Sequence, residues 1–501
     1  MLRASSYVIY VDLPGDAEQM LLVHGYSGAY DRVARHVGAY LRSMEVGPRP
    51  APLYGEWASE PGPGPQGALP PPSEDTLLRL RKRGYLTEKT VEEEEEFLAR
   101  VAGQHHGYMQ QRRLTYIVMP TYDCNLRCSY CFQDYMRTNP AFGNLLRAMP
   151  QAMIDRMLTA WVKLEERHRV PPGAPRNVTF FGGEPLLAGL RPTIESILRK
   201  AGDLGPATFG AVTNGTDLHA YRDLLHPQGL SWLQITLDGP PGEHDKRRIY
   251  EDGRGSYEAI AENMTMALDR GVRVAVRLNV DRNNIDQLPE LAEEMVSRGW
   301  DRYGNFSVYT APIHANNGKT EMKTTMSSWQ LDKAITKLRE TFPAMRLIAR
   351  PDDGMLARAQ RLFENHADPL STFKSSFCGA HNGMYVFDAF GDVYACWERT
   401  GNPAIRIASI TEAGDIKWEE NTDKLWKSRT VASNPTCRKC RYALYCGGGC
   451  AVLAMDFRGE FFTNFCDGFA SRFRDAVAQA HNGSLSGVGA GAQERESVCG
   501  T

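Results

Sequence analysis

Six short apolar runs alternate with amphipathic helical segments between residues 112 and 320, and this alternation constrains the fold more than any other feature. Between the first two runs, Ile154, Leu158 and Trp161 recur at helical spacing. Strands that alternate with helices form a parallel sheet wound with one hand, so we expect an open sheet or a partial barrel. The runs lie at 114–119, 177–181, 207–212, 232–237, 273–280 and 305–310.

Two of these runs favour the barrel, because each has one polar face. In WLQITLDG, Gln234, Thr236 and Asp238 alternate with leucine and isoleucine, and Arg277 and Asn279 alternate with apolar residues in the next run. A strand covered by helices on both sides should be apolar on both faces. We therefore predict an α/β fold with a partial (β/α)6 TIM-like barrel, whose inner face lines a polar cavity near the carboxyl ends of its strands. An exposed, half-buried sheet is the alternative.

Residues 1–105 form a separate α+β module in our prediction. SYVIYVD and MLLVHG are typical of strands, and the apolar spacing in 29–44 indicates a helix. The Pro- and Gly-rich stretch 60–75 predicts a linker or long loop. After it, Thr90 and Glu93 predict a capping box for a helix that carries the acidic run 92–96, which we expect to be a solvated face.

The remaining domain boundaries follow changes of composition. We assign 112–320 to the barrel, 321–377 to a helical bridge, 378–480 to a cysteine-rich domain and 481–501 to a flexible Gly- and Ser-rich tail.

Charge and hydropathy exclude several classes of partner. Lys and Arg total 58 against 60 for Asp and Glu, which leaves no large basic field for nucleic acid or anionic lipid. No run approaches the roughly 18 apolar residues that a membrane helix requires. The first apolar run lacks a cleavage site, so we expect a cytoplasmic protein. In that reducing compartment, the 11 cysteines are better suited to metals or chemistry than to disulfides.

Three cysteines, Cys124, Cys128 and Cys131, follow the first strand at spacings of four and three. Three thiolates on one compact loop suit a metal cluster and leave one iron open. A structural zinc site is the alternative, but it normally requires a fourth ligand close by. The nearest histidines, His105 and His106, lie before the strand.

The C-x3-C-x2-C spacing, with Tyr130 before the last cysteine, resembles the signature of the radical S-adenosylmethionine (radical SAM) enzymes. FFGGEP, TNGT and TLDGP, after the second, third and fourth strands, are similar to other segments of that family. The resemblance implies a 4Fe-4S cluster whose open iron takes the amino and carboxylate groups of S-adenosylmethionine. Residues that the resemblance implies around this cofactor are Tyr130, Gly182, Gly183, Glu184, Pro185, Thr213, Asn214, Thr236, Arg277 and Asn279.

Two of these assignments have a physical basis in the residue type. Gly182 and Gly183 would let backbone groups approach the methionine amino group without a side-chain clash. Arg277 could hold the methionine carboxylate by a charge-assisted hydrogen bond, or it could form a structural ion pair.

A second cysteine group resembles the SPASM extension, which in relatives binds two auxiliary 4Fe-4S clusters. The resemblance implies that Cys437, Cys440, Cys446 and Cys466 ligate the outer cluster, and that Cys378, Cys396 and Cys450 ligate the inner one. The inner cluster is one ligand short. A non-cysteine residue, Cys499 or a substrate donor could complete it, and we favour an iron left open for substrate. Without the first motif, the C-x2-C-x5-C-x3-C spacing from Cys437 to Cys450 would favour a zinc knuckle.

These features together predict a radical S-adenosylmethionine oxidoreductase that modifies a peptide or protein and receives electrons from a low-potential donor. We expect a crosslink in a ribosomally made peptide, because the module at 1–105 resembles leader-peptide recognition domains in outline. Asp238 is either the proton acceptor of the oxidation or an anchor for the loop that follows it. A sulfatase-type maturase that oxidises Cys or Ser, and a non-catalytic zinc or iron-sulfur scaffold or electron-transfer protein, are the alternatives.

Overall fold

The computed structural model describes residues 2–46, 69–111, 114–315, 317, 319–364 and 369–485. These residues form two compact units. The terminal unit comprises Met1–Met109, Asp352–His381 and Ser428–Thr501, and the sheet unit comprises Gln110–Pro351 and Asn382–Lys427. The predicted cysteine-rich domain, 378–480, therefore contributes residues to both. Within the described ranges, no helix is long and apolar enough to cross a membrane.

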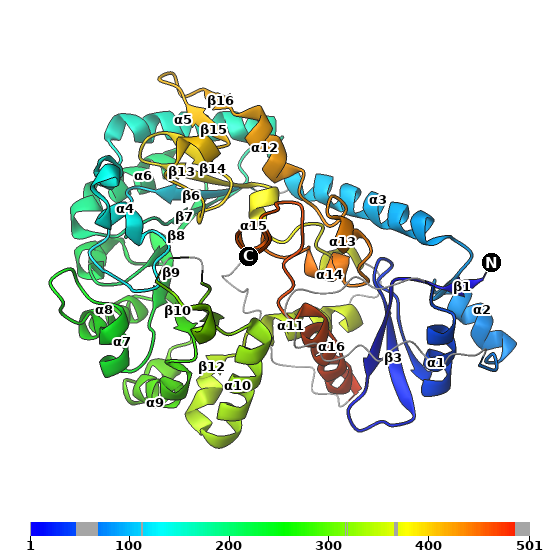
Figure 1. Cartoon of the computed structure of the whole chain (residues 1–501). Helices are drawn as coiled ribbons and strands as arrows, with labels where there is room; N and C mark the ends of the chain where they lie inside the picture. Colours follow the sequence, from blue (N-terminus) through cyan, green and yellow to red (C-terminus); the bar gives the residue numbers. More distant parts are fainter. Residues whose placement is uncertain are drawn as a thin grey trace. The chain divides into compact units, whose positions relative to one another are not determined.

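The sheet unit contains all six predicted strands (Figure 1). Neighbours pair in parallel and in chain order, so Val276 lies opposite both Ile235 and Val308. The mostly parallel α/β fold is thereby confirmed. The six strands are β6 (Thr115–Met119), β7 (Arg176–Phe180), β8 (Ala207–Thr213), β9 (Leu230–Thr236), β10 (Arg273–Val280) and β11 (Phe306–Pro312).

Further strands extend this sheet at both edges. The short β12 (Ile348–Ala349) pairs with β11, and β13 (Met384–Asp388) pairs in parallel with β6. Antiparallel strands β14 (Asp392–Tyr394), β15 (Ala408–Ile410) and β16 (Ile416–Trp418) then continue outward from β13. The hydrogen-bonded order runs from β12 to β16 without closing. The strand β13, which lies within the predicted cysteine-rich domain, is thus the neighbour of β6, the strand that leads to Cys124.

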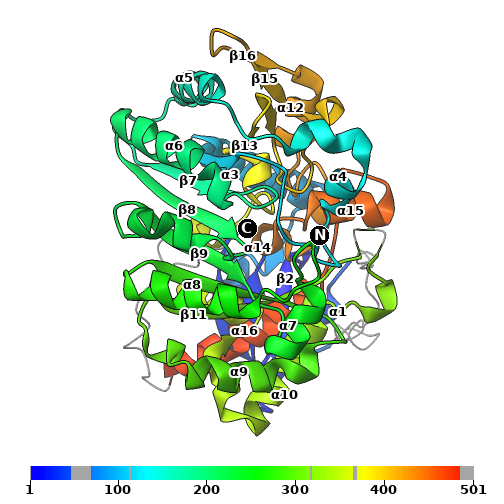
Figure 2. The same cartoon turned by 90° about the vertical axis from the view of Figure 1, so that its left-hand side faces the viewer.

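Helices cover the sheet because their apolar stripes face it. Ile154, Leu158 and Trp161 are all buried, as their spacing predicted, and the Trp161 ring stacks on Tyr116 of β6 with centroids 4.4 Å apart. Figures 1 and 2 show α6, α8 and α9 along one face of the parallel strands. The helices of this unit are α4 (Asp134–Thr138), α5 (Gln151–Arg167), α6 (Arg191–Asp203), α7 (Pro241–Arg247), α8 (Tyr257–Asp269), α9 (Leu288–Ser297), α10 (Ser328–Thr341) and α12 (Glu420–Lys427).

The polar faces of β9 and β10 are buried rather than exposed. Gln234, Thr236 and Asn279 are each less than a tenth exposed, and the Tyr309 hydroxyl donates a 2.7 Å hydrogen bond to Gln234 Oε1. The alternative of an exposed sheet is therefore wrong. These polar groups face the inside of the unit and bind one another.

The terminal unit begins with an antiparallel sheet of β2 (Val8–Asp12), β3 (Gln19–His24) and β4 (Tyr30–Ala34). The first two strands were predicted. The predicted helix in 29–44 is wrong in its first third, because α1 (Arg35–Ser43) begins only after β4. Tyr30 and Val33 pair across β3 with Val23 and Met20, and β-branched and aromatic residues favour such pairing over a helix.

The acidic helix α3 (Val91–Gln110) confirms its capping box: Thr90 N donates to Glu93 Oε2 at 2.8 Å and Glu93 N donates to Thr90 Oγ1 at 3.2 Å. The expectation of a fully solvated acidic face is wrong at Glu94, which is completely buried. Its carboxylate accepts from Arg3 Nη2 at 2.8 Å and from Ser5 Oγ at 2.6 Å. The ion pair with the buried Arg3 therefore compensates for the burial of the Glu94 carboxylate.

Further helices and two short strands complete the terminal unit. The predicted linker lies outside the described residues over 60–68, as do 486–501 of the predicted tail, including Cys499. The remaining elements are β1 (Arg3–Ala4), β5 (Leu86–Thr87), α2 (Glu74–Lys82), α11 (Asp353–Glu364), α13 (Pro435–Arg438), α14 (Ala443–Cys446), α15 (Ala451–Arg458) and α16 (Phe469–Leu485).

Candidate functional site

The loop after β6 gathers the three predicted cysteines of the sheet unit. Cys128 interacts electrostatically with both Cys124 and Cys131, and Cys131 N donates to the Cys128 carbonyl at 3.1 Å. A bridge between Leu126 and Tyr250 fastens the middle of the loop to the segment after α7. The three thiols are thus held on one short, braced segment at the carboxyl end of a parallel strand, where α/β proteins bind their ligands.

The glycine pair after β7 packs against this loop. Gly182 has φ of +134°, and a Cβ there would lie 2.5 Å from the Thr121 carbonyl oxygen. A Cβ on Gly183 would lie 2.0 Å from the Asp123 carbonyl oxygen. The glycines are therefore required for the approach of the cysteine loop itself. Their predicted contact with a cofactor amino group stays a prediction.

Glu184 joins the ends of β7 and β8. Its buried carboxylate accepts from Thr213 Oγ1 at 2.6 Å and from Asn214 N at 2.6 Å. The Asn214 side chain then donates to Cys124 Sγ at 3.8 Å. Burial raises the pKa of Glu184 to about 7, and the hydrogen bonds from Asn214 and Thr213 oppose that shift. These residues reach the cysteine loop as a connected set, and Pro185, also buried, follows them.

Tyr130 is the centre of a polar network between the loop and β10. Its hydroxyl donates to Asp238 Oδ2 and accepts from Arg248 Nη1 at 2.7 Å and from Asn279 Nδ2 at 3.1 Å. The sequence predicted Tyr130, Asp238 and Asn279 as site residues from separate segments, and the structure brings them together.

Asp238 is completely buried and both its carboxylate oxygens have protein partners. Oδ1 accepts from Asn279 N at 3.2 Å, and the Asp238 carbonyl accepts from Asn284 Nδ2 at 2.7 Å. These contacts give Asp238 an anchoring role at the ends of β9 and β10. Its predicted role as a proton acceptor stays a prediction.

Arg277 lies beside Thr236 in the register of β9 and β10. Its Nε donates to Asn279 Oδ1 at 2.9 Å, and it forms no ion pair with any described residue. Its two terminal nitrogens therefore lack an acidic partner at the carboxyl ends of the strands. The structural ion pair that sequence analysis allowed for Arg277 is not found within the described part of the chain.

Two arginines next to the cysteines were missed from the sequence. The Arg137 side chain is 1% exposed, and its Nη2 donates to Cys131 Sγ at 3.4 Å while Nε and Nη1 are buried without a partner. Arg248 is buried, and its Nε also lacks a partner. Arg137 follows the motif by only six residues, but nothing in the sequence shows that it is buried.

These arginines oppose the effect of burial on the thiols. Burial raises the pKa of Cys124 to about 12 and that of Cys128 to about 11, while Arg137 and Arg248 respectively act in the lowering direction. Buried, unpartnered N–H donors beside three thiols fit an anionic, sulfur-ligated iron cluster. The chemistry of the donors present therefore suits the group that the cysteine spacing implies.

The four cysteines predicted for the outer auxiliary cluster meet within the terminal unit. Cys437 interacts electrostatically with Cys440, Cys446 and Cys466. Asn434 caps α13 by accepting from Cys437 N at 3.2 Å, which orients the first of them. The four thiols thus come from three short segments of one unit, and the outer cluster stays a prediction.

The inner set is divided between the units. Cys378 and Cys450 belong to the terminal unit, and both interact electrostatically with Arg429. Cys396 belongs to the sheet unit. The inner cluster and its fourth ligand stay predictions.

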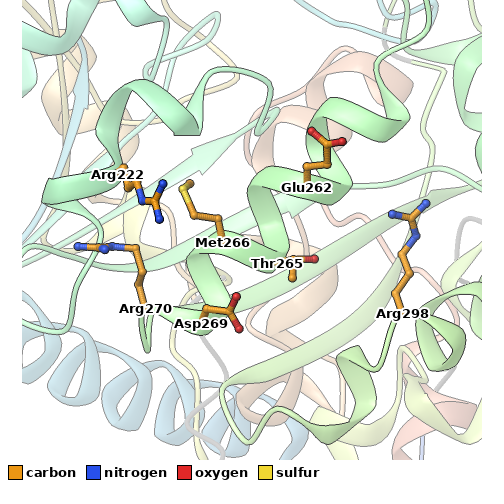
Figure 3. A pocket seen from close by; sticks show the side chains of 7 residues that line it. All are labelled: Arg222, Glu262, Thr265, Met266, Asp269, Arg270 and Arg298. Atoms are coloured by element: carbon orange, nitrogen blue, oxygen red, sulfur yellow. The ribbon is translucent and has the colours of Figure 1, made fainter.

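Other potential sites are weak. Among the described residues, no three His, Cys, Asp or Glu side chains lie as close as a single metal ion requires. Figure 3 shows a surface hollow lined by Arg222, Glu262, Thr265, Met266, Asp269, Arg270 and Arg298. Most of these belong to the outer helix α8 and its neighbours, away from the carboxyl ends of the strands. Five of its seven lining side chains are charged, whereas small-molecule sites are lined mainly by hydrophobic and aromatic side chains.

Comparison with known proteins agrees with this geometry. Residues 118–295 match the model of the radical SAM superfamily. The chain is 22% identical over 382 residues to pre-heme d1 synthase of Dinoroseobacter shibae, covering 67% of this chain and 81% of that protein. It is 22% identical over 385 residues to the cysteine-type anaerobic sulfatase-maturating enzyme of Clostridium novyi, covering 74% of this chain and 96% of that protein. The solved structure of native anSMEcpe with bound AdoMet and Cp18Cys peptide superimposes with a TM-score of 0.53 at 17% identity, covering 74% of this chain and 99% of that one.

Proposed function

We propose that this chain, whose residues 118–295 match the radical SAM superfamily, is a radical SAM enzyme that oxidises a peptide or protein substrate. Membership of this superfamily implies a 4Fe-4S cluster and S-adenosylmethionine. In our proposal Cys124, Cys128 and Cys131 hold that cluster. The product we favour is a crosslink in a ribosomally made peptide, formed in the cytoplasm with electrons from a low-potential donor.

One observation carries the proposal. Three thiols occupy a braced loop at the end of a parallel strand, and two buried arginines beside them keep N–H donors without protein partners. An anionic cluster together with a cofactor carboxylate would satisfy such donors. A protein that needed only a packed core would not bury Arg137 in this way.

The bound pair of cluster and S-adenosylmethionine supplies a radical that removes a hydrogen atom from substrate. The residues of this chain have three tasks around it. Glu184 and Asn214 connect the strand ends to the cysteine loop, Tyr130 and Asp238 fix the loop to β10, and Arg277 offers donors for a carboxylate. Such fixed geometry is what directs a reactive intermediate to one bond.

The N-terminal sheet supports a peptide as the substrate class. Among the described residues, strand β4 pairs only with β3, and its residues are half-buried or exposed. An extended peptide can add to such an edge through backbone hydrogen bonds. The structure of anSMEcpe that superimposes on this chain contains the bound Cp18Cys peptide, which agrees with this substrate class.

A sulfatase-type maturase is a second candidate, because the chain covers 96% of the Clostridium novyi sulfatase-maturating enzyme. That reaction would convert one Cys or Ser to an aldehyde. The module at 1–105, which such a task does not need, is our reason for ranking it second.

The test is anaerobic reconstitution with iron and sulfide, followed by reduction with dithionite and addition of S-adenosylmethionine. Release of 5'-deoxyadenosine is the expected result, and zinc without nucleoside release would contradict the proposal. Mass spectrometry of peptides encoded beside the gene then identifies the product. A loss of two hydrogens without hydrazide labelling indicates a crosslink, whereas labelling by a hydrazide reveals the aldehyde of the second candidate.

A further inference from the structure

Three cations lie among the cysteines of the terminal unit. Arg429 is 2% exposed and interacts electrostatically with the thiols of Cys437, Cys450, Cys378 and Cys446. Arg358 and Lys374, both half-buried, interact with Cys446 as well. Positive charge is thus concentrated at the site where the outer cysteines converge.

Arg429 also fastens the segments that carry two of these cysteines. Its Nη1 donates to the Gly449 carbonyl at 2.9 Å, directly before Cys450. Its Nε donates to the Phe461 carbonyl and its Nη2 to the Thr463 carbonyl, each at 2.8 Å. Both carbonyls lie in the segment that leads to Cys466. The planar guanidinium is therefore fixed in direction by three backbone oxygens.

These three cations have no carboxylate partner among the described residues, although Asp467 lies next to Cys466 and acts on its thiol electrostatically. In the ranges that the structure describes, neither Arg429, Arg358 nor Lys374 has a carboxylate oxygen within 4.0 Å. Elsewhere in the same unit, Arg3 pairs with Glu94 at 2.8 Å and Arg441 with Glu45 at 3.2 Å. A buried cation without a carboxylate partner is costly, so this site suits an anionic group such as a thiolate-ligated cluster.

We infer that Arg429, with Arg358 and Lys374, is the built-in countercharge of the auxiliary cluster and raises its reduction potential, so that the cluster accepts the electron released by the oxidation more readily. The inference rests on the proposed function. Reduction adds one negative charge to a thiolate-ligated cluster, and fixed positive charge in a poorly solvated site stabilises the reduced form more than the oxidised form. The electron comes from the substrate radical, which loses a proton as its new bond forms.

Arg429→Gln tests this in the reconstituted full chain, with iron and sulfide content and an anaerobic redox titration followed by electron paramagnetic resonance as readouts. We expect cluster content to be retained and the midpoint of an auxiliary cluster to fall. A tenfold change in the ratio of oxidised to reduced cluster corresponds to 59 mV for one electron. Arg429→Lys, which keeps the charge, should have a midpoint close to that of the wild type. Arg83→Gln removes an exposed arginine of the same unit, paired with Asp31, and should leave the midpoint unchanged.

The outcomes separate the inference from the proposed function. Retained clusters with an unchanged midpoint in Arg429→Gln overturn the inference and leave the proposed function intact. A wild-type protein with iron for only one cluster overturns the inference too, while nucleoside release still decides the radical SAM proposal. If Arg429→Gln loses its clusters, Lys374→Gln decides: a lowered midpoint supports the inference, and an unchanged one overturns it.

Discussion

The buried arginines beside the two cysteine sites of this chain have different partners. In the sheet unit the arginines near Cys124 have acidic company: Arg137 lies 3.9 Å from Asp134, and Arg248 reaches Asp238 through the Tyr130 hydroxyl. In the terminal unit Arg429 is held only by carbonyl oxygens. Arg137 and Arg248 near Cys124 are therefore linked to carboxylates, whereas no described carboxylate oxygen lies within 4.0 Å of Arg429.

This difference is informative because, in our proposal, the two sites hold clusters that need different potentials. Cleavage of S-adenosylmethionine requires an electron at very low potential, and protein iron-sulfur clusters reach about −700 mV at the lower limit. Carboxylates near the arginines reduce the positive field at the first site. At the second site no described carboxylate oxygen lies within 4.0 Å of Arg429, Arg358 or Lys374, and in our inference this favours electron uptake there. In our inference, the charge pattern around the cysteines therefore distinguishes the site that cleaves S-adenosylmethionine from the site that accepts the electron.

The largest effect should come from removing one cysteine at each site. Cys124→Ala should abolish 5'-deoxyadenosine release, since the open iron is no longer held correctly. Cys446→Ala should lower iron content by about one cluster and still release nucleoside. Iron analysis and nucleoside chromatography measure both. Cys499→Ala is the control, and we expect its iron content to be unchanged; a loss of one cluster would identify the tail as a ligand.

Glu94→Ala should destabilise the protein by about 3–5 kcal/mol, because it leaves the Arg3 guanidinium buried without its carboxylate. Urea unfolding measures the change. Glu96→Ala, on the exposed face of the same helix, should stay within about 0.5 kcal/mol of the wild type. If Glu94→Ala proves equally mild, unpaired buried arginine carries little cost in this unit, and the contrast between the two sites loses its basis.

Tyr130→Phe should destabilise the sheet unit by about 1–3 kcal/mol, since Arg248 Nη1 and Asn279 Nδ2 lose their acceptor in a buried place. The ring is kept, so iron content should match that of the wild type. The hydroxyl carries no charge, so the variant should leave the net charge of the first site and the midpoint of its cluster nearly unchanged, which redox titration measures. A midpoint shifted as far as in Arg429→Gln would mean that hydrogen-bond links tune these sites as strongly as charge does.

The smallest effect concerns pH. Asp388, at the end of β13, is buried and accepts from the Tyr122 hydroxyl at 3.1 Å. Burial, together with the nearby Asp392, raises its pKa to about 7 from 3.8. The folded state then holds this proton over a range where the unfolded state has lost it, so stability should fall as pH rises from about 4 to about 7.

The slope from Asp388 should reach at most about 1.4 kcal/mol per pH unit within that window. Asp388→Asn removes the titration and should flatten the pH dependence, whereas the exposed Asp286→Asn should not. Urea unfolding at pH 5 and pH 7.5 compares the three proteins. Identical slopes in all of them would show that Asp388 does not titrate in this range.

The six central strands were predictable because apolar alternation is a local signal, and parallel order follows from the helices between them. The Cys124 loop and its glycines were predictable because their spacing is local as well. Strand β4 was missed because its pairing with β3 overrides the helical spacing of Val33.

Features that depend on distant packing were not predictable. Glu94 sits within an acidic run that reads as solvated, and only its contacts with Arg3 and Ser5 reveal it as buried. Arg137 and Arg429 have no motif, and their significance depends on burial that no local pattern encodes. Charge balance around a site is thus a property of the folded chain rather than of any segment of it.

The parallel pairing of β13 with β6 has a consequence for biosynthesis. The strand that carries the cysteine loop is made early, yet one of its edges stays open until residues 384–388 have left the ribosome. Such distant pairing slows folding and exposes an edge that other chains can join. Cluster insertion into the nascent chain would therefore meet an incomplete sheet, and a chain truncated before Met384 should aggregate rather than load iron.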